Sequence, residues 1–163
     1  MGARGSRGLA VLTRRKGPRG AIDHGAGVAP SVIDGAARVL GVALPQDYVE
    51  FLRVYGWASL GCNEIYGLGD DVPRHLDVVR LTLSERLEAQ PAMPRHLVAL
   101  MNDGFGNHDC LDTSQLRDGR CPVVFWDHDK GPNQQPEPIA ADFNTWLDEL
   151  VEHAAREITG EAF

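Results

Sequence analysis

The sequence has no long apolar segment, few cysteines and fewer basic than acidic side chains. Its longest uninterrupted apolar runs are a few residues long, whereas a membrane-spanning helix needs about 18–20 apolar residues. This excludes an integral membrane protein built from such helices. The three cysteines, Cys62, Cys110 and Cys121, are widely spaced and odd in number, so they fit neither a disulfide framework nor a CxxC zinc site. We therefore expect the chain in a reducing cytoplasm.

What is present is the composition of one globular domain with unevenly divided charge. The chain has 163 residues, of which 43% are hydrophobic and 24% charged, unlike a disordered protein. Residues 1–27 carry six basic side chains and one acidic side chain, whereas residues 28–163 carry 10 basic and 22 acidic, a net charge of −12. Such an acidic body repels nucleic-acid phosphates and attracts a basic partner. We predict no direct nucleic-acid binding by the acidic body and no membrane association.

Residues 1–27 are rich in glycine and arginine and lack apolar periodicity, which is typical of a flexible arm. The pair Arg14-Arg15 suggests a twin-arginine export signal, but no apolar stretch of about 7–15 residues follows it, so we expect no export. The arm has three interpretations: a disordered extension, a nucleic-acid contact, or the product of an upstream start codon. The predicted organisation is this arm, a single domain over 28–156 that we expect to be monomeric, and a C-terminal tail over 157–163.

Hydrophobic periodicity predicts the elements of that domain. Helices with an apolar stripe at 3.6-residue spacing are predicted over residues 31–40, 45–55, 76–87 and 143–154. Ser31, with Asp34 in the capping-box position, is the predicted N-cap of the first helix, and Gly41 its end. A short strand that runs into a glycine-punctuated turn is predicted over 64–69, and strands over 97–101, 108–112 and 122–126. The predicted turn residues of the hairpin between the second and third strands are Asp103, Gly104, Gly106 and Asn107. The segment 130–138 holds three prolines and a glycine and is predicted to be irregular. This order, without βαβ alternation, indicates an α+β fold with helices packed on a largely antiparallel sheet.

Two short clusters hold the side chains that could carry chemistry. They are His108, Asp109, Cys110 and Asp112, and Asp127, His128 and Asp129. Such groups can ligate a metal or form a Cys-His nucleophile, but their spacing matches no established ligand pattern. Cys110 suits a sheet interior and Asp112 a turn or cap. We therefore predict no catalytic residue, no metal site and no cofactor. The three tryptophans, Trp57, Trp126 and Trp146, are predicted to lie in the core.

Five segments in sequence resemble the SMI1/KNR4 (SUKH) family over residues 28–153. They are the LG…LPQDY…FL…GW pattern of residues 40–57, EIYG at 64–67, the DGFGN…LD hairpin within 97–112, PVVFWDH at 122–128, and FNTWL at 143–147. The resemblance implies an α+β domain that acts by binding. In bacteria such domains are mostly immunity proteins of polymorphic or contact-dependent toxin systems, often directed against nucleases. It carries no catalytic residues over to this chain.

The leading hypothesis is therefore an immunity protein that binds a basic toxin through its acidic surface. The predicted contact residues are acids in loops or at strand ends: Asp70, Asp71, Asp109, Asp127, Asp129 and Glu137. The alternative is a regulatory or scaffold module of the same family without a toxin partner. A third hypothesis is an enzyme that uses Cys110, His108 or His128.

Overall fold

The computed structural model describes residues 8–10 and 22–160, so most of the predicted arm lies outside the described residues. The elements follow in the order β1 (Ile22–His24), α2 (Pro30–Leu40), α3 (Gln46–Val54), β2 (Ala58–Leu60), β3 (Asn63–Ile65), η1 (Arg74–Leu76), α4 (Val78–Leu87), β4 (Leu97–Asn102), β5 (His108–Asp112), η2 (Thr113–Gln115), β6 (Val123–Trp126), β7 (Glu137–Ala140) and α5 (Phe143–Thr159). The strands form two antiparallel sheets, β1-β2-β3 and β4-β5-β6-β7.

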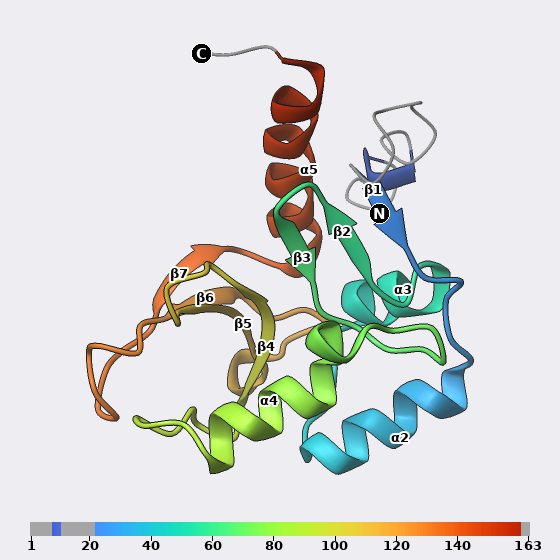
Figure 1. Cartoon of the computed structure of the whole chain (residues 1–163). Coiled ribbons are helices and arrows are strands. Elements are labelled where there is room, and N and C mark those ends of the chain that lie inside the picture. The colour runs from blue at the N-terminus through green and yellow to red at the C-terminus, as the bar shows by residue number, and fades with distance from the viewer. Residues whose placement is uncertain (1–7, 11–21, 161–163) are drawn as a thin grey trace.

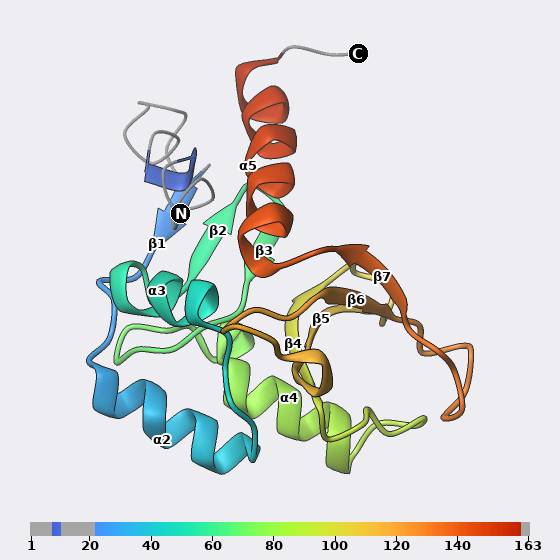
Figure 2. The ribbon, with the colours of Figure 1, turned by 180° about the vertical axis from the view of Figure 1, so that it is seen from behind.

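Figure 1 shows the two sheets in the middle of the molecule, with α5 at one end and α2 and α4 at the other. Figure 2 shows the same arrangement from behind. The predicted α+β class with antiparallel strands is confirmed, with two sheets in place of one. Of the helices in the described ranges, none combines the length and apolar composition that crossing a bilayer requires.

The start of α2 differs from its prediction. Ala29 is the N-cap and makes no side-chain hydrogen bond, so the predicted Ser31 cap with Asp34 is wrong. Pro30 gives the reason, because its fixed φ suits the first helical position and its missing N–H is not needed there. Gly41 ends the helix in the left-handed conformation at φ 70°, as predicted.

Three short strands extend the sheets beyond the predicted ones. β1 and β2 have three residues each, too few to show alternation, and they pair with one another. β7 begins at Glu137 and includes Pro138, so the prediction of an irregular segment is wrong for its last two residues. β7 pairs with β6 at the edge of the described sheet, where proline is tolerated. Of the predicted arm, residues 22–24 form β1 and Leu9 is fully buried, while α5 continues to Thr159.

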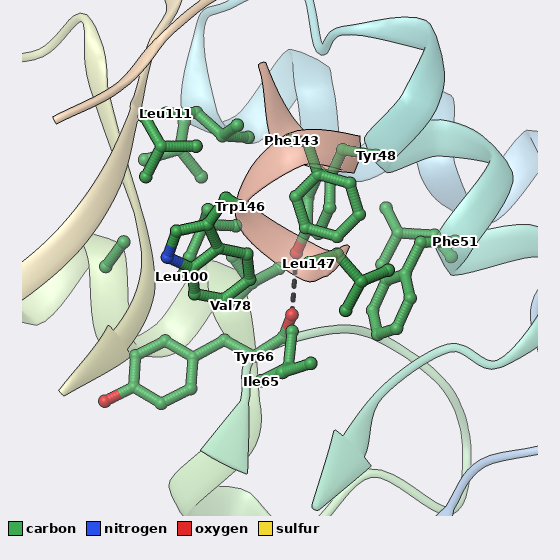
Figure 3. Packing of buried hydrophobic residues seen from close by; sticks show 14 of the residues in the cluster. Tyr48, Phe51, Ile65, Tyr66, Val78, Leu100, Leu111, Phe143, Trp146 and Leu147 are labelled. Carbon is green, nitrogen blue, oxygen red and sulfur yellow. Dashed lines mark hydrogen bonds between the residues drawn. The ribbon is translucent and has the colours of Figure 1, made fainter. Parts of the chain in front are cut away.

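The two sheets meet where the chain leaves β3 at Tyr66 and Gly67. The Tyr66 N–H donates to the Leu100 carbonyl of β4 at 2.8 Å. The buried Tyr48 hydroxyl of α3 donates to the Tyr66 carbonyl at 2.8 Å, the dashed line of Figure 3. The Gly67 N–H donates to the Leu76 carbonyl, also at 2.8 Å. This short segment therefore joins both sheets, α3 and the approach to α4.

Aromatic side chains fill the space between α3 and α5. The Phe143 ring centroid lies 5.1 Å from that of Tyr48, 5.4 Å from Phe51 and 5.7 Å from Trp146. Figure 3 shows this group beside the Tyr48–Tyr66 hydrogen bond. All three tryptophans are buried, as predicted: Trp57, Trp126 and Trp146.

The close approach at Gly67 can be tested by adding one methyl group. A Cβ at Gly67 would overlap the Gly56 carbonyl oxygen, which also accepts the Leu68 N–H. We expect Gly67→Ala to lower the free energy of unfolding by about 3 kcal/mol or more, since the backbone can move only by breaking hydrogen bonds. Gly35→Ala in α2 is the control: its Cβ meets nothing within 4 Å, and it should stabilise by up to about 1 kcal/mol. Urea denaturation measures both, and equal stability of Gly67→Ala and the natural chain would contradict the overlap.

Candidate partner-binding surface

The six predicted contact residues lie in three separate places. Asp70 and Asp71 lie in the connection between β3 and η1, Asp109 lies on β5, and Asp127, Asp129 and Glu137 lie at the two ends of the β6–β7 connection. Figures 1 and 2 show the β3–η1 connection beside α3 and the β6–β7 connection on the opposite side of the molecule. The structure therefore places Asp70 and Asp71 apart from the other four acids. Asp109 lies opposite Phe125 of β6, which in turn lies opposite Glu137 of β7.

The β6–β7 connection is held by its own polar groups. Asp127 Oδ1 accepts the Asp129 N–H at 2.9 Å, and the Gln134 side chain donates to the carbonyl of Asp127 at 2.7 Å. Glu137 pairs with Phe125 in the register of β6 and β7, two residues from Asp127. The Asp129 side chain is 85% exposed and Glu137 is exposed. These two carboxylates are available to a partner.

Asp71 and Asp109 are engaged within the fold. Asp71 is exposed, but its carboxylate accepts the Ala26 N–H and the Trp57 Nε1–H, each at 3.2 Å. Asp109 is half-buried, and its Oδ2 accepts the Trp146 Nε1–H at 2.9 Å. Burial raises the pKa of Asp109, while the bond from Trp146 acts in the opposite direction. Both carboxylates hold tryptophan side chains in place, whereas Asp70 is exposed.

The β4–β5 hairpin packs against the end of β6 through one asparagine. Asn107 Oδ1 accepts the backbone N–H of His128 at 3.1 Å and lies 2.8 Å from its Nδ1. Asn107 Nδ2 donates to Asp103 Oδ2 at 2.8 Å. Asp103 was predicted to be a turn residue, and turn chemistry alone does not show that it lies beside the β6–β7 connection. We call Asp103, Asp127, Asp129 and Glu137 the acidic corner.

Asp127, His128 and Asp129 also include the donor atoms of a conceivable metal site. One ligand atom from each lies within 4.8 Å of the others. The hydrogen bonds of this loop account for their positions. Asp127 Oδ1 accepts the Asp129 N–H, and the His128 ring contacts Asn107 Oδ1. His128 Nε2 also lies 3.3 Å from Asp129 Oδ1. We assign these residues to the loop and no metal to them.

The two buried cysteines, Cys110 and Cys121, do not have the surroundings of nucleophiles. Cys110 is fully buried, and its thiol donates to the backbone carbonyl of His108 at 3.7 Å and not to an imidazole. Burial raises the pKa of Cys110 well above its ordinary value and that of Cys121 to about 12. Both thiols are therefore protonated at neutral pH, whereas the thiolate is the reactive form. Cys110 packs in the sheet interior, as predicted.

His108 is buried in its neutral form. Asn102 Oδ1 accepts the Gly104 N–H at 2.6 Å, which turns the Asn102 Nδ2 toward His108 Nε2 at 3.2 Å. We therefore assign Nε2 as the acceptor and the ring proton to Nδ1, which is buried and has no hydrogen-bond partner among the described residues. Burial lowers the pKa of His108 to about 4. The imidazole is thus a neutral core group at physiological pH.

His108 should make the protein sensitive to mild acid. Its pKa is about 4 in the folded chain and about 6.5 in an unfolded one, so the unfolded chain binds the proton more readily. Stability is therefore full above pH 6.5 and falls between pH 6.5 and 4, by at most about 1.4 kcal/mol per pH unit from this group. Urea denaturation at several pH values should show that His108→Gln removes this slope, while His75→Gln, at an exposed position, retains it. Parallel pH profiles of His108→Gln and the natural chain would contradict the assignment.

Comparison with known proteins agrees with the fold. Residues 23–152 match the model of the family described as SMI1-KNR4 cell-wall (SUKH_5). The crystal structure of a protein from Pseudomonas syringae pv. tomato superposes with a TM-score of 0.65 at 14% identity, covering 90% of this chain and 98% of that chain. At this identity the superposition shows a shared fold. The match over residues 23–152 confirms the resemblance found in the five sequence segments, and the chain belongs to the SMI1/KNR4 (SUKH) family.

Proposed function

We propose that this chain is a non-enzymatic immunity protein that binds a cognate toxin and neutralises it. Membership of the SMI1/KNR4 (SUKH) family supports a protein-interaction or immunity-type role. The observation that carries the finer proposal is the acidic corner, where exposed carboxylates stand on two hydrogen-bonded loops. A toxin that cleaves nucleic acid needs a basic groove for phosphates, and such a groove is complementary to this corner.

The proposed mechanism is occlusion of the toxin by binding. Carboxylates of the corner take the place of substrate phosphates at basic side chains of the toxin. Long-range attraction from a body of net charge −12 speeds the encounter and weakens as salt screens it. We place this event in the cytoplasm, with one copy of this chain for each toxin.

The protonation states of the buried Cys110 and His108 favour a role in binding over a role in catalysis. Cys110 is protonated and bonded to a backbone carbonyl, and His108 is neutral and buried. Neither has the exposure or the pKa that nucleophilic or acid–base chemistry requires at neutral pH. Cys110 and His108 therefore give the enzyme hypothesis no activated group.

Co-expression with secreted-toxin candidates drawn from the genes that neighbour the gene of this chain tests the function. We expect restored growth and a stable 1:1 complex whose affinity falls as salt rises. Restored growth with salt-insensitive binding would keep the immunity role and contradict the acidic corner. Absence of both rescue and complex would contradict the immunity role and favour the regulatory or scaffold module.

Removal of two carboxylates should locate the binding surface. Asp129→Asn with Glu137→Gln should weaken the complex by about tenfold at low salt, mainly through slower association, and should reduce its salt dependence. Asp34→Asn with Glu152→Gln removes the same charge from exposed positions on α2 and α5 and serves as the control. Stopped-flow or biosensor kinetics across a salt series distinguish them. Equal weakening by both pairs would show a general charge effect without a defined corner.

A further inference from the structure

The tip of the β4–β5 hairpin carries the most exposed large apolar side chain of the described residues. Phe105 is 81% exposed, although it lies between residues that sit in hydrogen-bonded turns. Single exposed apolar side chains are common on protein surfaces, so exposure alone says little. The backbone that presents Phe105 and the charges around it distinguish this position from the other exposed apolar residues.

The backbone of the tip is fixed before any partner arrives. Asp103 Oδ1 accepts the N–H groups of Phe105 at 2.8 Å and of Asn107 at 3.1 Å, and the Asp103 N–H donates to the Asn107 carbonyl at 3.1 Å. Gly104 and Gly106 on either side of Phe105 have φ values of 86° and 93°, which glycine adopts without strain. Because the backbone of the turn is already ordered, binding costs the rotamer entropy of the Phe105 side chain but little backbone entropy.

The hairpin tip is also tied to the β6–β7 connection. Asn107 bonds both to Asp103 and to His128, so the tip and the loop form one unit. A Cβ at Gly106 would lie 3.2 Å from the His128 ring, which shows how closely the two loops pack. Phe105 therefore projects from the same rigid unit that carries the acidic corner.

The two loops joined by Asn107 carry more acidic than basic side chains. Burial acts to raise the pKa of Asp103, but hydrogen bonds from Asn107 and Phe105 hold it below its ordinary value, so this carboxylate is ionised at neutral pH. Asp127 and Asp129 are the neighbours of His128, whose N–H donates to Asn107 of the hairpin. The same loop also carries the basic side chain of Lys130. An apolar side chain with this surround fits an apolar pocket that has Lys or Arg side chains at its rim.

We propose that Phe105 is the anchor of the partner interface: it inserts into an apolar pocket with a basic rim on the protein partner, while the acidic corner contacts that rim. This assignment rests on the proposed function and names the residue that holds the complex together. Interface energy concentrates on a few central aromatic side chains, and charges around them mainly set the association rate. Phe105 and the corner should therefore affect different rate constants.

The test compares Phe105→Ala, Phe105→Trp and Val39→Ala in complexes with a toxin candidate from a neighbouring gene. Phe105→Ala should weaken the complex by at least about 30-fold through faster dissociation, with association and salt dependence unchanged. Phe105→Trp should retain much of the affinity, and Val39→Ala, at a 60% exposed position on α2, should bind like the natural chain. Thermal melting of the free variants should match that of the natural chain, because the Phe105 side chain contributes little packing.

The outcomes distinguish failure of the Phe105 anchor from failure of the proposed immunity role. A complex and growth rescue by the natural chain, with Phe105→Ala binding equally well, would overturn the anchor and leave the immunity role intact. A lower melting temperature of Phe105→Ala would assign Phe105 to the fold and likewise overturn the anchor. Absence of a complex with the natural chain would overturn the immunity role and the anchor that depends on it.

Discussion

The rest of the structure depends on the close approach of two backbone segments, at Gly56 after α3 and at Gly67 after β3. A side chain at Gly67 would overlap the Gly56 carbonyl, and the neighbouring N–H of Leu68 donates to that same oxygen. With the segments in contact, Tyr66 can reach β4 with its N–H and the Tyr48 hydroxyl with its carbonyl. The hydrogen bond from Tyr66 to Leu100 then joins the three-stranded and the four-stranded sheet into one framework.

This framework fixes the last helix and, through it, the larger sheet. The buried Asp47 carboxylate accepts the Asn144 N–H at the start of α5 at 3.1 Å, and burial raises the pKa of Asp47. Asp109 reaches α5 from β5 through the Trp146 indole. Acids near this helix are therefore used to hold the fold. Asp103, Asp129 and Glu137 remain exposed at the β4–β5 hairpin and the β6–β7 connection, and we assign this part of the molecule to recognition.

Local sequence signals predicted much of the fold, and the failures have physical causes. Gly41 ended its helix as predicted, because this role depends on the φ of one residue. The sequence also predicts Asp142 as the N-cap of the last helix, and its carboxylate accepts the Thr145 N–H there. The predicted Ser31 N-cap was wrong because the helix already begins at the preceding Pro30. β7 was not predicted because it contains Pro138, and proline is excluded from central strands but tolerated in edge strands. Whether a strand lies at the edge or in the centre of its sheet cannot be inferred from the local sequence.

The sequence by itself determined the fold class, the family, the absence of an established ligand pattern and the acidic charge of the body. It also marked the DGFGN turn, because glycine and Asx-turn residues act within a few positions of the chain. Only the tertiary structure decided which acids belong together. It placed Asp109 against Trp146 and separated Asp70 and Asp71 from the acidic corner. It also linked Asp103 to the loop of Asp129 through the contact between Asn107 and His128. These relations join residues that are distant in sequence, and they follow from the packing of whole sheets and helices, which no local pattern encodes.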